Sequence, residues 1–210
     1  MLRKKALYPK LRLMLVAGKK DAGQRTVSEL ALLAFQGGVS ALQLREKSLD
    51  DNQFYDQALE LRALSKEHNK LFIINNRVDI ALAVDADGVH LGESDLNVAT
   101  AAKLLSKDKI IGYSASSAVK AKEAILKGAD YLGVGALYPS PSKPEAKQID
   151  ADTISSIIAL KWPTVGIGGI TTENAHLAWA YGFNGLALIS ALAQAQDPTQ
   201  AAKKILAGCI

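Results

Sequence analysis

The sequence has few of the residues that build covalent cross-links, metal cages or activated nucleophiles. Cys209 is the single cysteine among 210 residues, so neither an internal disulfide nor a cysteine-rich metal site can form. The three histidines include no pair at the spacing of metal ligands. No Ser/His/Asp or Cys/His grouping is recognisable, so no protein nucleophile is indicated.

Long apolar runs and a strong net charge are also absent. No segment approaches the ~20 apolar residues of a membrane span. Near the N-terminus, Lys10 and Arg12 interrupt the apolar stretch, and residues 13–17 are too few for the apolar region of a secretory signal. The net charge of +4 suits an anionic substrate but is too weak and dispersed for nucleic acid. We expect a cytoplasmic protein that binds small molecules rather than membranes or nucleic acid.

Short apolar runs alternate along the chain with segments of helical spacing. An apolar content of 49% and a charged content of 22% are typical of a globular protein. Phe54, Ala58 and Leu61 fall on one face of a predicted helix. Thr26 and Glu29 have the spacing of a capping box at the start of another. No proline-rich or serine-rich linker divides the chain, so we expect one domain over residues 1–210.

Eight of the apolar runs are typical of buried parallel strands. They are Leu11–Val16, Ala41–Leu44, Leu71–Ile74, Gly88–Leu91, Ile110–Tyr113, Tyr131–Val134, Thr164–Ile167 and Leu186–Ile189. Eight strands that alternate with helices in about this length predict an α/β fold, a (β/α)8 TIM barrel. A doubly wound open sheet is the alternative.

Polar residues follow most of these runs, where barrels of this class build their sites. Gln43, Arg45 and Lys47 alternate after the second run, which predicts that they point the same way. The other strand ends are followed by Asn75, Asn76, Glu93, Asp95, Ser114, Ser140, Ser142, Lys143, Gly168, Gly169 and Ser190. The sequence therefore predicts one site assembled from several strand ends.

Two of these segments suggest anion binding. In "GALYPSPSKPEAKQ", residues 135–148, three prolines restrict a loop that offers the hydroxyls of Ser140 and Ser142 and the ammonium of Lys143. A surface linker is the alternative interpretation. The pair Gly168-Gly169 lets backbone amides approach a ligand, and the loops after strands seven and eight commonly hold phosphate in such barrels. An ordinary turn is the alternative there.

The motifs "ALQLREK", "INNRVDIALAVDADGVHLGESDL", "GADYLGVGALYPSPSKPEA", "VGIGGIT" and "LALISAL" together resemble the thiamine phosphate synthase family, related to the thiazole tautomerases. The resemblance covers nearly the whole chain and implies a (β/α)8 barrel transferase of thiamine biosynthesis. Such an enzyme couples 4-amino-5-hydroxymethyl-2-methylpyrimidine diphosphate to thiazole phosphate, releases pyrophosphate and needs Mg²⁺.

The resemblance also implies roles for individual residues. The pyrimidine diphosphate would be contacted by Gln43, Leu44, Arg45, Glu46, Lys47, Asn75 and Ser114. The substrate phosphates would meet Ser140, Pro141, Ser142 and Lys143, and the thiazole phosphate would meet Gly169, Ile189 and Ser190. Arg45, Lys47 and Lys143 would be the catalytic cations that stabilise the departing diphosphate. Asp95 would bind magnesium, with Asn76 as a weaker second ligand.

The sequence departs from the family pattern at three places. Asn76 stands where the family usually has a second aspartate, which predicts weaker magnesium binding. Serines replace the usual threonines in the proline-rich loop, and Ser116 occupies a position where many relatives have histidine. A tautomerase would use that histidine for proton transfer, so Ser116 disfavours this rival while Asn76 favours it. A catalytically silent phosphate-binding relative is the third hypothesis.

Three further features stay open or have a structural interpretation. His90 is expected to be a packed histidine within its strand. Glu93 is either a supporting group near the metal site or a solvated residue. Self-association into a homo-oligomer stays open, because no predicted helix exposes an obvious interface.

Overall fold

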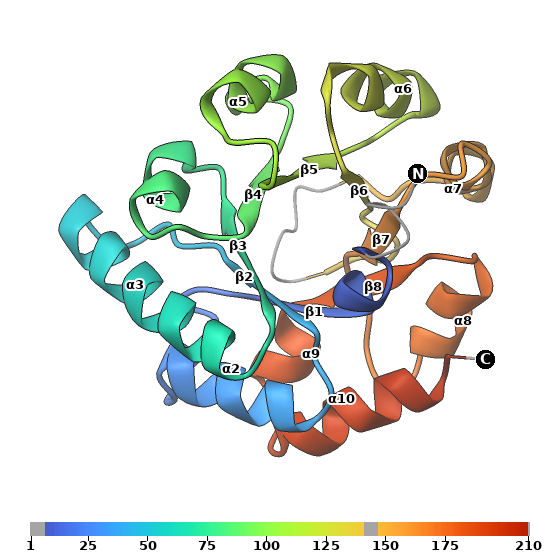
Figure 1. Cartoon of the computed structure of the whole chain (residues 1–210). Coiled ribbons are helices and arrows are strands. Elements are labelled where there is room, and N and C mark those ends of the chain that lie inside the picture. Colours follow the sequence, from blue (N-terminus) through green and yellow to red (C-terminus); the bar gives the residue numbers. More distant parts are fainter. Residues whose placement is uncertain (1–6, 141–146, 210) are drawn as a thin grey trace.

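The structure, a computed structural model, describes residues 7–140 and 147–209. Its centre is a closed barrel of eight parallel strands in the order β1 to β8 (Figure 1). The last strand pairs with the first, with Leu188 beside Leu15, and this pairing closes the sheet. The predicted (β/α)8 TIM barrel is therefore confirmed, and the open doubly wound sheet is excluded.

The strands are short and the helices lie outside them. The strands are β1 Leu13–Ala17, β2 Ala41–Leu44, β3 Leu71–Asn75, β4 Gly88–Leu91, β5 Ile110–Ser114, β6 Tyr131–Val134, β7 Thr164–Ile167 and β8 Gly185–Leu188. The helices are α2 Val27–Gln36, α3 Asp51–Glu67, α4 Val78–Ala83, α5 Val98–Leu104, α6 Ala118–Lys127, α7 Ala151–Ile158, α8 Ala175–Ala180, α9 Ser190–Ala193 and α10 Pro198–Ala207, preceded by the 3-10 helix η1 Pro9–Leu11.

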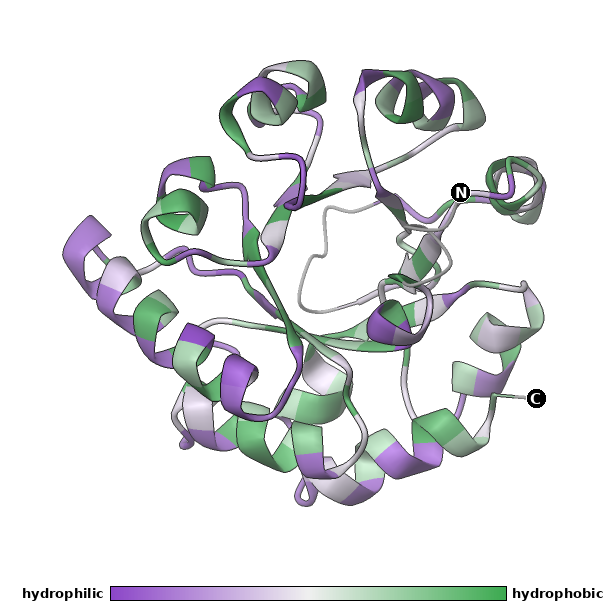
Figure 2. Ribbon diagram, viewed as in Figure 1, coloured by the Kyte–Doolittle hydropathy of each residue, from purple (hydrophilic) through white to green (hydrophobic). Residues whose placement is uncertain are grey.

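The strands bury side chains on both faces, which explains their apolar sequences. Met14, Ile73 and Val165 point into the barrel and form an inner core. Leu15 and Leu42 belong to the larger core between the strands and the surrounding helices. Figure 2 shows the apolar colour concentrated on the strands and on the inner helix faces, with polar residues outside. Two buried faces per strand are the rule for parallel sheets covered by helices.

Side-chain caps set the starts of many helices. The predicted capping box is present at α2, where Thr26 accepts the N–H of Glu29 and the Glu29 carboxylate accepts the N–H of Thr26. Further helices begin after the capping side chains of Asp50, Asn97, Ser117, Asp150 and Asp197. None of the helices formed by the described residues is long and apolar enough to cross a bilayer.

Four of the eight strands differ from their predicted bounds: β1 and β8 are shifted at both ends, and β3 and β5 each extend one residue further, to Asn75 and Ser114. The first strand begins at Leu13, because Leu11 ends the 3-10 helix η1. Leu11 is fully buried in the inner core, so its hydrophobicity alone resembles that of a strand residue. The eighth strand ends at Leu188, because Ile189 turns the chain out of the sheet with φ −114° and ψ −89° and opens α9.

Candidate active site

The loops after β1 and β2 are joined at the barrel mouth, the end of the barrel where the strands have their C-termini. The carboxylate of Glu46 accepts the backbone N–H of Lys19 at 2.7 Å, across the two loops. It also accepts the N–H groups of Lys47 and Ser48 at 2.7 and 2.8 Å and the Ser48 hydroxyl at 2.7 Å. Glu46 was predicted to contact substrate. In the structure its carboxylate instead accepts hydrogen bonds from the two loops and holds them together.

The other residues of the β2 segment lie in three different environments. Gln43 is buried inside the barrel and donates from Nε2 to the sulfur of Met14 at 3.3 Å. Leu44 packs in the outer core, so only its backbone is available to a ligand. The strand ends there, and Arg45 and Lys47 are loop residues, half-buried and exposed respectively. The alternation that predicted a common direction for the three polar side chains therefore stops at Leu44.

A row of three polar side chains connects the barrel interior to its mouth. His90 on β4 places Nδ1 2.9 Å from the hydroxyl of Tyr131 on β6. Its Nε2 lies 2.9 Å from the hydroxyl of Ser114 on β5. Tyr131 is 1% exposed and His90 is 9% exposed, whereas Ser114 is exposed at the strand end. Burial lowers the pKa of His90 to about 4, so the ring is neutral.

Asn75 and Asn76 lie beside this row at the end of β3. The register pairs Asn75 with His90 on β4. The side chain of Asn75 donates to the carbonyl oxygen of His90 at 3.3 Å, and the backbone N–H of Asn76 donates to the same oxygen at 2.9 Å. Asn75 on β3 and Ser114 on β5, both predicted site residues, thus contact His90.

Asp95 lies in the turn that follows β4, the strand paired with β3. Its Oδ2 accepts the N–H of Gly92 at 2.6 Å, which fixes the carboxylate in the turn. A carboxylate has a second oxygen available to a cation. No three His, Cys, Asp or Glu side chains form a metal cluster within the described parts of the chain. Mg²⁺ is commonly held by one or two protein groups together with substrate phosphates, so one carboxylate and an amide oxygen fit it.

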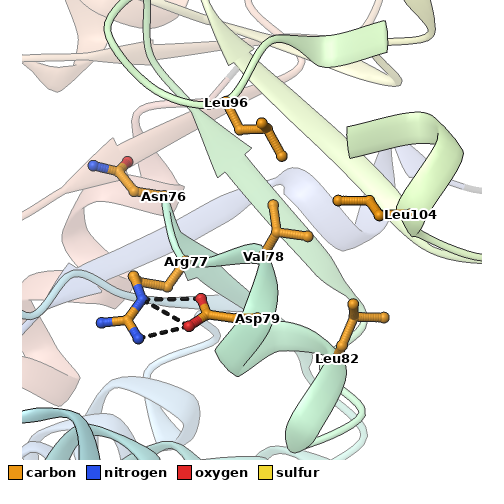
Figure 3. Close-up of a pocket in the computed structure, with 7 residues that line it drawn as sticks. All are labelled: Asn76, Arg77, Val78, Asp79, Leu82, Leu96 and Leu104. Carbon is orange, nitrogen blue, oxygen red and sulfur yellow. Dashed lines mark hydrogen bonds and ion pairs between the residues drawn. The ribbon is translucent and has the colours of Figure 1, made fainter. Parts of the chain in front are cut away.

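Asn76 also borders a groove outside the barrel, between α4 and α5. The groove has a volume of about 370 Å³, and its lining includes Val78, Leu82, Leu96 and Leu104. Figure 3 shows these four side chains turned toward one another, while the amide of Asn76 points away from them. Arg77 and Asp79 also line the groove, and Arg77 donates to the carboxylates of Asp79 and Asp51. The rest of the lining beyond Asn76 is apolar, and Arg77 is already paired with two carboxylates, so the groove does not suit a phosphorylated ligand.

Glu93 belongs to a surface ion pair beside the mouth. Lys120 on α6 donates to both carboxylate oxygens of Glu93 at 2.7 Å, and Ser116 donates to one of them at 2.7 Å. The Lys120 and Glu93 side chains are 45% and 47% exposed. Hydrogen bonds from Lys120 and Ser116 hold the pKa of Glu93 below its usual value. Glu93 is therefore an ionised partner of a lysine at the surface.

The loops after β6 and β7 pack directly on each other. Tyr138 donates its N–H to the carbonyl oxygen of Gly168 at 3.0 Å. Gly169 has φ +62°, and a Cβ there would stand 2.4 Å from the carbonyl oxygen of Pro139. Only glycine permits this approach without displacement of the neighbouring backbone. The chain that leads to Ser140 thus lies against the glycine pair, so the two loops predicted to bind phosphate are in contact.

The proline-rich loop is closed at its base. Ile149 donates its N–H to the carbonyl oxygen of Ala136 at 2.9 Å. Gln148 donates from Nε2 to the carbonyl oxygen of Leu137 at 2.9 Å. Three of the residues predicted to bind phosphate, Pro141, Ser142 and Lys143, lie outside the described residues.

The glycine pair and the end of β8 form the remaining part of the predicted site. Asn174 donates to the carbonyl oxygen of Gly169 at 2.9 Å and accepts the N–H of Thr171 at 2.8 Å, so it ties the turn to the start of α8. Ile189 and Ser190 are half-buried where β8 passes into α9. The first N–H groups of a helix have no acceptor within it and can bind a ligand.

Two residues of this framework were missed by sequence reasoning. Asn174 lies in "TTEN" before α8, a pattern typical of a helix start that could have revealed it. Tyr131 was treated only as part of an apolar strand. Alternation along β6 puts Tyr131 on the same face of the strand as Gly133, but it does not identify the contact of Tyr131. That contact is His90, 41 residues away in the sequence. Local patterns do not reveal such a pair.

The closed barrel places this chain in the class of (β/α)8-barrel proteins. Sequence similarity identifies the family within that class. The sequence model of the thiamine monophosphate synthase family matches residues 13–192. A thiamine-phosphate synthase of Methanobrevibacter smithii is 43% identical over 82% of this chain and 83% of its own length. One of Coprothermobacter proteolyticus is 42% identical over 98% of both chains. The chain belongs to the thiamine monophosphate synthase family.

Solved structures agree with this assignment. A thiamine phosphate pyrophosphorylase from Pyrococcus furiosus has a TM-score of 0.88 and 36% identity, over 97% of both chains. A 3-hexulose-6-phosphate synthase has a TM-score of 0.69 at 18% identity and shares the fold alone.

Proposed function

We propose that this chain is a thiamine-phosphate synthase. It joins 4-amino-5-hydroxymethyl-2-methylpyrimidine diphosphate to thiazole phosphate and releases pyrophosphate. The observation that supports this most is the 42% identity to a thiamine-phosphate synthase over 98% of both chains. Its partners are two small phosphorylated heterocycles rather than nucleic acid or membranes, and its location is the cytoplasm.

The reaction exchanges one bond for another at a single carbon. The bond between the pyrimidine methylene carbon and the diphosphate oxygen breaks, and the electron pair leaves with the diphosphate. The aminopyrimidine ring stabilises the resulting cation, so a dissociative substitution is reasonable. The thiazole nitrogen then supplies the electron pair of the new carbon–nitrogen bond. No protein nucleophile is needed.

Cationic side chains at the mouth stabilise the charge that develops on the diphosphate. Arg45 and Lys47 lie in the β2 loop, and Glu46 between them fixes that loop through its contact with Lys19. Lys143 belongs to the proline-rich loop, whose preceding segment packs on Gly169. Fixed charges of this kind contribute most where the leaving group gains charge in the transition state.

The neutral parts of the site orient the pyrimidine half. Gln43 and Asn75 supply side-chain amides near the ends of β2 and β3. Leu44, whose side chain is buried, would contact the pyrimidine half through its backbone. Ser114 presents its hydroxyl at the end of β5, supported by His90. Positioning of the two reactants supplies much of the rate enhancement in such a reaction.

Asp95 and Asn76 would hold Mg²⁺ against the diphosphate. When bound, the ion neutralises negative charge on the leaving group. Asn76 provides one oxygen and no charge, so we expect the affinity for magnesium to be lower than two carboxylates would give. Gly169, Ile189 and Ser190 would hold phosphate at the ends of β7 and β8, where such barrels commonly bind it, and the proline-rich loop would contribute Ser140, Pro141 and Ser142.

A coupling assay with the two substrates tests the proposal. Wild-type protein with Mg²⁺ is expected to form thiamine phosphate and pyrophosphate in equal amounts, and chelation of the metal is expected to stop both. Interconversion of thiazole isomers without pyrophosphate release would instead indicate a tautomerase. Binding of either phosphorylated compound without turnover would indicate the catalytically silent relative.

A further inference from the structure

We propose that His90 is a positioning residue that fixes the direction of the Ser114 hydroxyl, so that Ser114 donates a hydrogen bond into the barrel mouth. The proposal rests on the proposed function only for the identity of the ligand that accepts this bond. The hydrogen-bond chain itself is a property of the free protein.

The chain begins at Tyr131, in the closed part of the barrel. Its hydroxyl is buried, and among the described residues its one hydrogen-bond partner is Nδ1 of His90, at 2.9 Å. A buried hydroxyl hydrogen without an acceptor is costly. The phenol must therefore donate to Nδ1, which in turn must be the unprotonated nitrogen of the ring.

The proton of the neutral imidazole consequently lies on Nε2. That nitrogen donates to the hydroxyl oxygen of Ser114 at 2.9 Å. Because the oxygen of Ser114 is occupied as an acceptor on this side, its own hydrogen points elsewhere, toward the exposed end of β5. The row of hydrogen bonds thus runs in one direction, from Tyr131 through His90 to Ser114 and into the mouth.

The ring is held in both its charge state and its orientation. Burial lowers the pKa of His90, and Tyr131 is the only titratable group that the described structure places on the ring. Gly112 and Gly133 leave room for it on the neighbouring strands. A Cβ at Gly112 would stand 2.5 Å from Nδ1 of His90, and one at Gly133 would stand 2.9 Å from Cε1. The ring thus occupies the space that a side chain at either position would need, and its two hydrogen bonds set its orientation there.

A serine that donates selects for an acceptor on the ligand. The pyrimidine half of the substrate has ring nitrogens with free lone pairs, and one of these is the group that we assign to Ser114. The opposite tautomer would make the hydroxyl an acceptor and would favour an amino group. The tautomer of a buried histidine thus sets the polarity of a contact at the mouth.

Nitrogen-15 NMR of the free protein tests the chain without any turnover. His68 and His176 serve as internal references, and the variant His90→Gln assigns the remaining pair of ring signals. We expect Nδ1 of His90 to be unprotonated and Nε2 to be protonated, unchanged between pH 5.5 and pH 9, that is, above the His90 pKa of about 4. A proton on Nδ1, or titration near the ordinary pKa of 6.5, would overturn the proposal.

Kinetics of Tyr131→Phe test the consequence for binding. Loss of the phenol frees the tautomer, and we expect KM for the pyrimidine diphosphate to rise about 5-fold. Tyr113→Phe is the matched control, because Tyr113 lies on β5 against the outer core, and it should leave KM unchanged. Ser114→Thr, which keeps the hydroxyl, should retain more affinity than Ser114→Ala.

A double-mutant cycle separates positioning from a general structural effect. Because Tyr131 acts through Ser114, adding Tyr131→Phe to Ser114→Ala should produce no further rise in KM. Additive effects would overturn the proposal. If the wild-type protein forms no thiamine phosphate but shows the predicted ring signals, the proposed function fails and the hydrogen-bond chain stands.

Discussion

Glu46 and Lys19 join two loops of the barrel mouth: the carboxylate of one accepts the backbone N–H of the other at 2.7 Å. Removal of this carboxylate in Glu46→Ala should loosen the loop that contains Arg45 and Lys47. We expect KM for the pyrimidine diphosphate to rise about 10-fold, the equivalent of one lost charge-assisted hydrogen bond. Steady-state kinetics measures this. Glu123→Ala, which removes a surface partner of Lys127 on α6, is the control. An unchanged KM in Glu46→Ala would contradict the role.

The same carboxylate predicts a pH-dependent contribution to stability. Burial raises the pKa of Glu46, but the hydrogen bonds from Lys19, Ser48 and Lys47 outweigh it and hold the pKa below 4.5. Because the pKa is lower in the folded than in the unfolded state, the ionised form stabilises the fold above the unfolded pKa, and this contribution disappears as the pH falls through the folded pKa.

Urea unfolding of wild type and Glu46→Gln over a pH series measures this contribution. The difference in the free energy of unfolding should be constant near neutral pH and should shrink below about pH 4. A difference that grows toward low pH would contradict the assignment of the ionised carboxylate as the hydrogen-bond acceptor.

The fold was predictable because parallel strands buried on both faces are recognisable by composition. The runs at Ala41–Leu44 and Gly88–Leu91 are strands with the predicted bounds. The predicted bounds missed the last residues of β3 and β5, Asn75 and Ser114, because these are polar. Two other boundaries failed where hydrophobicity had another cause. Leu11 is apolar because it fills the base of the barrel, and Ile189 because it packs against the inner core before α9.

The sequence predicted which strand ends several candidate-site residues follow, but not the contacts between those residues. The rule that strand ends form the mouth located Ser114 and Gly169 correctly at one end of the barrel. It did not show that His90 contacts Ser114, 24 residues away, or that Glu46 holds Lys19, 27 residues away. These contacts depend on side-chain directions in the closed barrel, which sequence periodicity does not specify.

Arg45 tests the electrostatic part of the proposed mechanism. Arg45→Ala should lower kcat/KM about 100-fold, because a fixed cation no longer stabilises the leaving diphosphate. Arg45→Lys keeps the charge but loses the planar fork of donors, so its loss should be smaller. Lys127→Ala, which removes one positive charge from the α6 surface, should have no effect. Equal losses in Arg45→Ala and Lys127→Ala would indicate a net-charge effect rather than a specific contact.

Asn76→Asp tests the proposed magnesium site by adding a second carboxylate to it. Asn76 has φ +65°, a left-handed conformation that aspartate tolerates nearly as well as asparagine. The backbone should therefore be unchanged, while a second carboxylate joins Asp95. We expect the magnesium concentration for half-maximal activity to fall about 5-fold, with Asp95→Asn moving it in the opposite direction. An unchanged magnesium dependence in Asn76→Asp would show that residue 76 does not face the ion.

Gly169→Ala tests the contact between the two loops that we propose to bind phosphate, and the chain contains a matched control. Gly169 and Gly23 have nearly the same backbone conformation, with φ +62° and φ +65°. Alanine at either position costs about 1 kcal/mol through left-handed strain alone. A Cβ at Gly23 would meet nothing within 4 Å, whereas a Cβ at Gly169 would stand 2.4 Å from the carbonyl oxygen of Pro139.

The difference between these two variants isolates the close approach from the backbone strain. Gly169→Ala should lower the free energy of unfolding by about 1–3 kcal/mol more than Gly23→Ala, because the segment before Ser140 must move away. Its KM for thiazole phosphate should rise, while that of Gly23→Ala should stay at the wild-type value. Urea unfolding and steady-state kinetics on both proteins measure this, and equal behaviour of the two variants would show that the loops do not depend on each other.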